Sequence, residues 1–249
     1  MERSPSSEFT EDGRGNTGLM VSFEERPNRF HPRHEEDAIL LSAAWARLAG
    51  GGFEARVVGR ELLDRWSEPH RRYHTLSHLW DTLRAVDILQ EEASDVDAVR
   101  YALWFHDAVY EGHPGEDEEQ SAWLAERLLD PLGVGPAMIS EVVRLVLLTK
   151  DHRPEEGDRD GGVVCDADLA VLGSARDEYL AYVTAIRAEY REIPEREFRC
   201  GRLAVLRSLL ERPSLFNTEF GRERWEPRAR ANISAEVDRL SGRRTGGLW

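Results

Sequence analysis

The stretch LSHLWDTLRAVDIL, residues 76–89, repeats apolar side chains at alternating steps of three and four residues. The apolar positions of this series are Leu76, Leu79, Leu83, Val86 and Leu89. On a helix of 3.6 residues per turn such positions share one face. The stretch is therefore predicted to be an amphipathic helix with its apolar face in a core.

The same spacing continues on both sides of this stretch. Upstream, two amphipathic helices are predicted on either side of the glycine triplet at 50–52. Downstream, Gly and Pro clusters separate further predicted helices, at 95–109, 117–129, 135–149, 175–191, 195–211 and 225–240. Strand-like alternation is nearly absent, and 161–165 is the only short β-branched stretch. The predicted fold class is all-α, a single compact helical bundle without internal repeats over residues 35–249.

Residues 1–34 differ from the rest of the chain. They are rich in Ser, Pro, Gly and mixed charges and show no sustained apolar period. Such a segment has too little apolar surface to fold onto a core. It is predicted to be a disordered tail with no role in the chemistry.

Composition excludes some classes of partner. The formal net charge is −14, from 33 basic and 47 acidic side chains in 249 residues, and a field of that sign repels nucleic-acid backbones and anionic membranes. We expect neither duplex nucleic acid nor a membrane as partner. The chain has only two cysteines, no secretory signal and no apolar run of membrane-spanning length, so a cytoplasmic location is predicted. A phosphorylated substrate would need local positive charge, which a divalent metal supplies compactly.

Two compact motifs contain three of the eight histidines. The first is RYHTLSH, residues 72–78; if it opens a helix, His74 and His78 are one turn apart and face the same way. The second is LWFHD, residues 103–107, where an apolar run meets an adjacent His and Asp. Neighbours on a helix diverge by roughly 100°, so both reach one ion only if it lies over the seam between them.

A third piece, CDADL at residues 165–169, places two carboxylates next to a short apolar segment. An isolated histidine in a helix is more often a core or surface residue than a ligand. Together, however, these motifs favour a site, because burying a His-Asp pair behind Leu-Trp-Phe is costly unless the charge is paired or bound to metal. The residues alone leave Asp166 and Asp168 as alternatives.

The order H…HD…D resembles the signature of the HD superfamily of metal-dependent phosphohydrolases. The matching residues here are His78, His106, Asp107 and Asp168. The likeness is closer to a bacterial group of predicted HD phosphohydrolases and covers roughly residues 37–240, through PHRRYHTLSH (69–78), FHDAVY (105–110), DADLAVLG (166–173) and LLERP (209–213). The resemblance implies an HD-type helical domain that holds a metal through those four residues.

The first motif is also similar to the Tyr-His-Asn-x-x-His segment of cyclic-nucleotide phosphodiesterases. That similarity implies that His74 protonates the leaving oxygen and that His78 binds metal. Thr75 stands here in place of the Asn. Residues 167–169 match the Ala-Asp-Leu that carries the distal metal ligand of that family, which favours Asp168 over Asp166.

The residue types fit this chemistry. Two imidazoles and two carboxylates suit Mn, Fe, Zn, Ni or Co, with Mg as a further option, and such an ion activates water and polarises a phosphoryl oxygen. We predict a metal-dependent phosphohydrolase that cleaves a phosphoester or pyrophosphate bond of a small phosphorylated metabolite, with a nucleotide as the expected substrate. The predicted catalytic residues are His74 and Asp107. The predicted substrate-binding residues are Arg72, Lys150 and His152.

Two alternatives remain at this stage. A di-iron HD-fold oxygenase would need more ligands, and His113 and His152 are the unassigned histidines well placed in sequence. A non-catalytic nucleotide-binding module is the other alternative. The sequence leaves open which metal binds, whether one or two, the exact substrate, phosphate or pyrophosphate as product, and whether the chain forms a homo-oligomer.

Overall fold

The computed structural model describes residues 34–242. The predicted N-terminal tail therefore lies outside the described residues, apart from its last residue, His34, where the first helix begins. Residues 243–249 also lie outside the described part.

Ten α-helices make up most of the described chain, and no strand occurs between residues 34 and 242. They are α1 (His34–Ala49), α2 (Phe53–Trp66), α3 (Leu76–Leu89), α4 (Val96–Phe105), α5 (Glu116–Leu129), α6 (Pro136–Leu148), α7 (Arg159–Leu169), α8 (Arg176–Glu189), α9 (Glu195–Glu211) and α10 (Glu226–Leu240). Short 3-10 turns follow α3, α5 and α7, and a π-helical turn, Gly221–Trp225, leads into α10. The predicted all-α class is confirmed.

Local sequence explains where α4 begins and how closely α1 and α2 pack. The Asp95 carboxylate caps α4 by accepting hydrogen bonds from the backbone N–H of Asp97 and Ala98. Between α1 and α2, a Cβ at Gly59 would lie 2.4 Å from the ring of Trp45. The Trp45 indole N–H donates to the Ala55 carbonyl at 2.7 Å. The absence of a side chain at position 59 thus lets the two helices approach.

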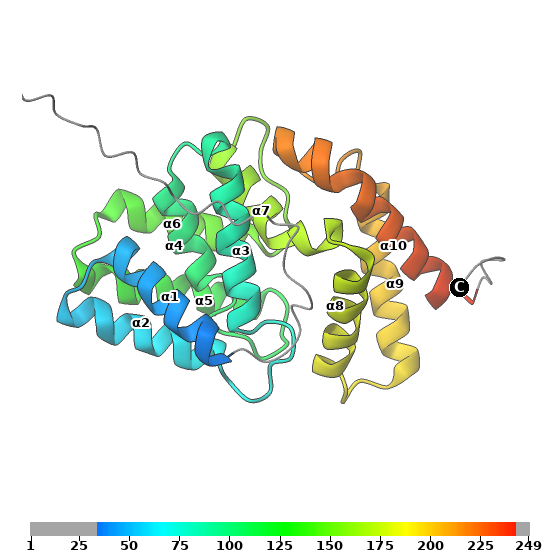
Figure 1. Cartoon of the computed structure of the whole chain (residues 1–249), viewed down its shortest axis with the longest axis horizontal. Coiled ribbons are helices and arrows are strands. Elements are labelled where there is room, and N and C mark those ends of the chain that lie inside the picture. Colours follow the sequence, from blue (N-terminus) through cyan, green and yellow to red (C-terminus); the bar gives the residue numbers. More distant parts are fainter. Residues whose placement is uncertain (1–33, 243–249) are drawn as a thin grey trace, which may run out of the picture.

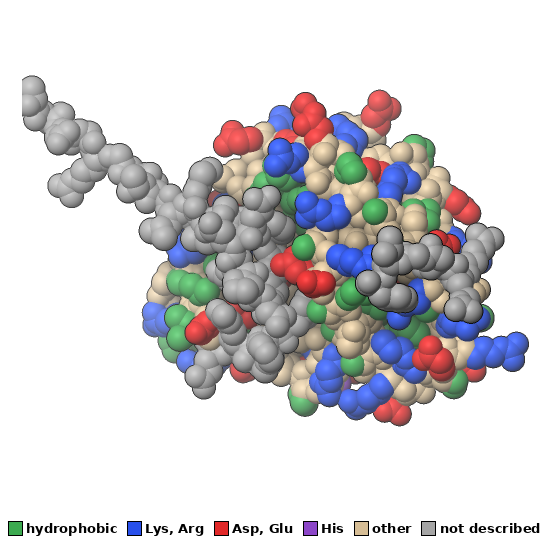
Figure 2. All heavy atoms as spheres, turned by 45° about the vertical axis from the view of Figure 1, so that its right-hand side comes forward, with side chains coloured by type: hydrophobic (Ala, Val, Ile, Leu, Met, Phe, Trp, Pro, Cys, Tyr) green, Lys and Arg blue, Asp and Glu red, His purple; other side chains and the backbone are tan. Residues whose placement is uncertain are grey.

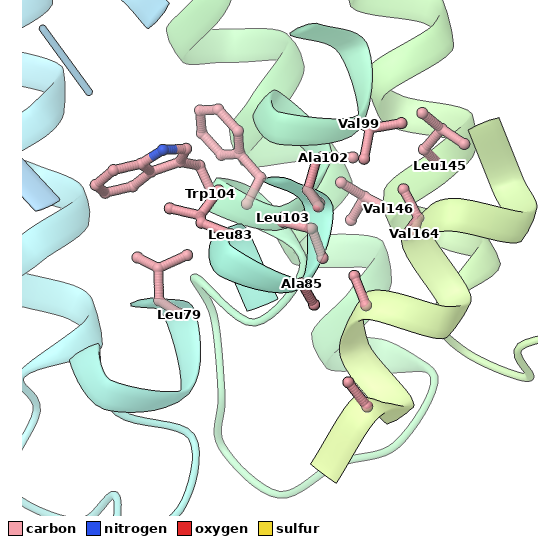
Figure 3. Packing of buried hydrophobic residues seen from close by; sticks show 14 of the residues in the cluster. Leu79, Leu83, Ala85, Val99, Ala102, Leu103, Trp104, Leu145, Val146 and Val164 are labelled. Carbon is pink, nitrogen blue, oxygen red and sulfur yellow. The ribbon is translucent and has the colours of Figure 1, made fainter. Parts of the chain in front are cut away.

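The core lies where α3, α4, α6 and α7 meet. Figure 3 shows Leu103, Val146 and Val164 of α4, α6 and α7 close together, with Leu83 of α3 beside Trp104, and all of them are buried. In Figure 1, α8, α9 and α10 lie together at one side of this group, and α1 and α2 lie at the other. The segment before α3 and the segment after α4 are joined by Arg71, which donates to the carbonyl oxygens of His74 and Asp107.

Helix α7 is the element that the sequence analysis did not predict. Residues 161–165 were noted only as a β-branched stretch, with the glycines at 157–162 as punctuation, yet the chain is helical from Arg159. Asp158 caps this helix by accepting from the N–H of Gly161 at 2.9 Å. A Cβ at Gly161 would lie 2.2 Å from the Asp158 carboxylate and 2.7 Å from Leu148. The glycine therefore allows close packing inside the helix.

The visible surface in Figure 2 carries basic and acidic side chains interspersed, with scattered apolar groups between them. Within the described chain, no helix combines the length and apolarity needed to cross a membrane.

Candidate metal centre

Three side chains from three separate segments converge in one cluster, two of them buried and one partly buried. One ligand atom each from His78, His106 and Asp168 lie within 4.8 Å of one another. His78 Nε2 is 3.1 Å from Asp168 Oδ1 and 3.4 Å from His106 Nε2. Asp107 joins from one side, with its Oδ2 3.1 Å from His106 Nε2 and 3.9 Å from His78 Nε2. The four predicted metal ligands are thus brought together.

The local backbone differs from the simple helical arrangement considered for the first motif. Helix α3 begins only at Leu76, so His78 lies in its first turn while His74 precedes the helix. The two imidazoles still approach each other, with ring centroids 5.5 Å apart. Their convergence comes from the turn before α3 and not from a shared helical face.

The second motif also leaves its helix before the site. Helix α4 ends at Phe105, and His106 occupies its C-cap with its backbone still in the right-handed helical region. His106 Nδ1 lies 2.8 Å from the Leu103 carbonyl oxygen. That contact assigns the proton to Nδ1 and leaves the lone pair of Nε2 facing the cluster.

The two carboxylates of the third segment, Asp166 and Asp168, have different surroundings. Asp168 faces the histidines, whereas Asp166 is fully buried and accepts hydrogen bonds from the backbone N–H groups of Asn217 and Thr218. The Thr218 hydroxyl and the Asn217 amide donate to it as well. Burial raises the pKa of Asp166 to about 6, although these hydrogen bonds act in the opposite direction. Asp166 therefore holds the loop before the π-helical turn, and Asp168 is the candidate ligand.

The electrostatics of the cluster favour a bound cation. Burial by itself lowers the pKa of His106, but the charges of Asp107 and Asp168 outweigh it and raise that pKa well above the usual value. Burial raises the pKa values of both carboxylates, and the neighbouring histidines lower them to below the ordinary range. Two carboxylates in so small a volume need a positive charge, which protons or a metal ion can supply. The donor set, two imidazole nitrogens and two carboxylates, fits a divalent transition metal.

His74 is held by a residue that the sequence analysis missed. Glu189, the last residue of α8, places Oε2 at 2.8 Å from His74 Nδ1, and its Oε1 accepts from the backbone N–H of Arg72, Tyr73 and His74. Tyr110 donates its hydroxyl to Oε2 at 3.2 Å and stacks on the imidazole. Burial lowers the pKa of His74, but the charges of Glu189 and Asp107 outweigh it, and the net shift is upward.

A small cavity opens beside the cluster, with a volume of about 170 Å³. Its lining includes His74, Asp107, Tyr110, Asp117, Glu118, His152 and Asp168. This is smaller than the roughly 300–1,000 Å³ of a pocket for a drug-sized ligand. It is large enough for a phosphoryl group, while the remainder of a larger substrate must lie outside it. A larger hollow of about 730 Å³ lies along α2 and shares no lining residue with the cavity.

The three predicted substrate-binding residues lie in different places. His152 lines the cavity, and its Nε2 is 2.7 Å from Asp168 Oδ2. Its backbone has a φ of 53°, in the left-handed region that costs a non-glycine residue free energy. Lys150 pairs with Glu119 at 3.0 Å, and Arg72 donates to the carbonyl oxygens of Pro69 and Arg71. Neither of those two lines the cavity.

Two further residues support the site without having been predicted for it. The buried Arg71 donates to the carbonyl oxygens of His74 and Asp107, and so joins the two loops that carry them. Asp117 accepts from the backbone N–H of residues 111–113 through Oδ2. Its Oδ1 is buried and has no hydrogen-bond partner among the described residues. Because Asp117 also lines the cavity, it is a candidate to contact what binds there.

Comparisons with known proteins give no relative: no family model, no curated protein and no solved structure matches this chain. The candidate site is therefore interpreted from its own geometry.

Glu189 was the clearest omission of the sequence analysis, and one signal pointed to it: an acid in the last turn of a helix is unfavourable against the helix dipole. Such an acid needs another partner, and here that partner is His74.

Proposed function

We propose that this chain is an HD-type, metal-dependent hydrolase of small phosphorylated metabolites. The observation that carries the proposal is the convergence of His78, His106 and Asp168 beside a cavity of about 170 Å³ whose wall also holds His74. A divalent transition metal bound to these residues supplies Lewis acidity, which makes water more acidic and polarises a phosphoryl oxygen.

The protein's own residues supply the remaining steps. Glu189 accepts from Nδ1 of His74, which fixes the ring so that Nε2 faces Asp107, 3.9 Å away. The charges of Glu189 and Asp107 raise the pKa of His74, which favours the doubly protonated imidazole. A protonated histidine beside the cavity is suited to give its Nε2 proton to the leaving oxygen. His74 is therefore the proposed general acid, and Glu189 is the residue that positions it.

The cavity limits the choice of substrate. Its lining contains no Lys or Arg side chain, so the positive charge that meets the phosphoryl group comes from the metal and the histidines His74 and His152. We infer that the phosphoryl group lies in the cavity and that the rest of the metabolite, with a nucleotide as the favoured class, extends from its opening.

The di-iron alternative has less support in the geometry. Of the two additional histidines that it requires, His152 lies at the site, but His113 is exposed and does not line the cavity. Oxygen consumption with two irons per chain would favour that alternative over hydrolysis.

The test combines metal analysis with a phosphate-release screen. The purified full-length chain is loaded with Mn, Fe, Co, Ni or Zn, its bound metal is quantified, and phosphate release is measured over a panel of nucleotides and sugar phosphates. Asp168→Asn removes a ligand charge from the cluster while keeping the side-chain shape. We expect this variant to lose stoichiometric metal and at least about a hundredfold in turnover.

Asp177→Asn is the matched control, because Asp177 is exposed in the first turn of α8, away from the cluster. It should retain both metal and turnover. Full metal occupancy in Asp168→Asn would refute the metal centre, and the absence of phosphate release from every substrate in the panel would refute the hydrolase.

A further inference from the structure

A groove lies next to the site cavity and shares His152 with it. Its volume is about 430 Å³, and it is bounded by the segment 152–154 and by the end of α9 with the loop that follows, through Asn217. Two arginines, Arg153 and Arg212, line it. No comparable pair of cations lines the site cavity itself.

Arg212 is fixed in place but keeps one donor unused. Its two terminal nitrogens donate to the backbone carbonyl oxygens of Asp151 and His152, at 2.8 and 3.0 Å. Its Nε is buried and has no hydrogen-bond partner among the described residues. A buried donor without a partner costs free energy, so this position favours a ligand that can accept a hydrogen bond.

Neither arginine is neutralised by a carboxylate of the described chain. No ion pair within 4.0 Å joins Arg153 or Arg212 to any acidic side chain between residues 36 and 242. Asp151 accepts instead from the backbone N–H of Arg153, and Glu211 lies on the wall of the groove. Burial and the like charge of Arg153 lower the pKa of the Arg212 guanidinium, and the opposing charge of Asp151 does not outweigh them. An anion between the two arginines would relieve this repulsion.

We propose that this groove binds a second phosphate group of the substrate, so that the natural substrate carries two phosphates. One phosphate lies in the site cavity beside His74 and Asp168, and the other contacts Arg153 and Arg212 beyond His152. The proposal rests on the proposed function, because it assumes that the first phosphate occupies the cavity. It also accounts for the small volume of that cavity, since the remainder of the substrate has its own site.

Alkanediphosphonates test this proposal, because they carry two non-hydrolysable anionic ends at an adjustable distance. Their dissociation constants for the metal-loaded full chain are measured by titration calorimetry, with the linker lengthened one methylene at a time. Alkylphosphonates of matched length serve as probes with a single anion. For at least one linker length the diphosphonate should bind more tightly than its monophosphonate counterpart. Arg153→Gln should reduce that gain about tenfold.

Arg153 is the better position for the variant, because Arg212 also holds the backbone of His152. The control is Arg196→Gln, at an exposed position in the first turn of α9 that does not line the groove. The proposal is overturned if Arg153→Gln keeps the full gain or if Arg196→Gln loses as much. Diphosphonate binding and phosphate release are measured separately. A protein that releases no phosphate but still binds the diphosphonate more tightly through Arg153 would refute the hydrolase and support the anion site.

Discussion

His74 lies between two carboxylates, and each faces a different nitrogen of its ring. Glu189 is 2.8 Å from Nδ1, and Asp107 is 3.9 Å from Nε2. The shorter contact orients the imidazole and the longer one leaves room for a reacting group between the two side chains. Nε2 of His78, in contrast, lies 3.1 Å from Asp168 Oδ1, inside the cluster of candidate ligands. The geometry thus separates the role of His74 from that of His78.

His74→Ala should keep the metal and lower turnover on substrates with poor leaving groups. Loss of a general acid costs on the order of a hundredfold or more. The loss should be much smaller for p-nitrophenyl phosphate, whose leaving group needs no proton. The measurement is kcat/KM on both substrate types, together with bound metal per chain. Equal losses on the two substrates would mean that His74 acts as a ligand or a structural residue.

Asp117 leads to a second prediction at the same scale. Its Oδ2 accepts from three backbone N–H groups, while its buried Oδ1 has no partner. Asp117→Asn keeps an acceptor for those N–H groups and replaces the unpartnered oxygen by an amide. If that oxygen accepts from a group bound in the cavity, we expect turnover to fall about tenfold with little change in melting temperature.

Asp117→Ala is the comparison variant. It removes the acceptor for all three N–H groups and should lower stability by about 1–3 kcal/mol as well. Wild-type kcat/KM in Asp117→Asn would show that Oδ1 does not act on the substrate or its water.

At the scale of the elements, the apolar spacing was sufficient to predict most helices but not α7. In α3 and α4 the buried face appears in the sequence as a regular series. In α7 two glycines stand near the start, and every residue from Gly161 to Ala167 is buried, so no polar face marks the period. Hydrophobic periodicity reports one-sided burial, and a helix surrounded by others does not show it.

A pair of glycine substitutions tests this account of α7. Gly161→Ala should destabilise the fold by roughly 1–3 kcal/mol, because its Cβ would meet Asp158 and Leu148 at less than 3.0 Å. Gly201, in the middle of α9, has no atom within 4 Å of the corresponding position. Gly201→Ala should instead stabilise by up to about 1 kcal/mol, through the higher helix propensity of alanine. Urea unfolding of the two variants should therefore shift in opposite directions.

Prediction of the site from sequence had a similar limit. The convergence of the candidate metal ligands could be predicted because each lies in a short motif whose residue types are unusual together. The position of Glu189 at the end of a helix indicates that it needs a partner but not which one. The pairing of Glu189 with His74 could not be predicted, because 115 positions separate the two residues. The same holds for Arg212, which reaches back to the carbonyl of His152. Contacts of this kind depend on how α8 and α9 pack, which spacing along the chain does not encode.

At the scale of the whole molecule, the later helices are joined to the site by a few polar contacts. Glu189 binds the loop before α3, Asp166 binds the loop at 217–218, and Arg212 binds the segment at 151–152. The Tyr73 and Tyr182 rings add an edge contact with centroids 4.8 Å apart. Helices α8 to α10 therefore help to fix the geometry of the candidate metal centre, whose candidate ligands all lie on earlier segments.

The stabilisation that the Glu189 carboxylate contributes should be lost only in strong acid. Burial raises the pKa of Glu189, but the charge and hydrogen bond of His74 and the backbone N–H groups of the loop outweigh it, and the pKa falls from 4.5 to about 2. The folded state thus binds this proton less tightly than the unfolded chain does. The resulting stabilisation, roughly 3 kcal/mol, is complete above the pKa that Glu189 has in the unfolded chain and is lost as the pH falls toward 2.

Glu189→Gln removes this stabilisation, so the difference in unfolding free energy from wild type should be largest near neutral pH and should shrink on acidification. Urea unfolding at a series of pH values measures this difference. The control Glu197→Gln, at an exposed position on α9, should show a small difference that does not change with pH. A pH-independent difference for Glu189→Gln would mean that Glu189 is not held as an ion in the folded protein.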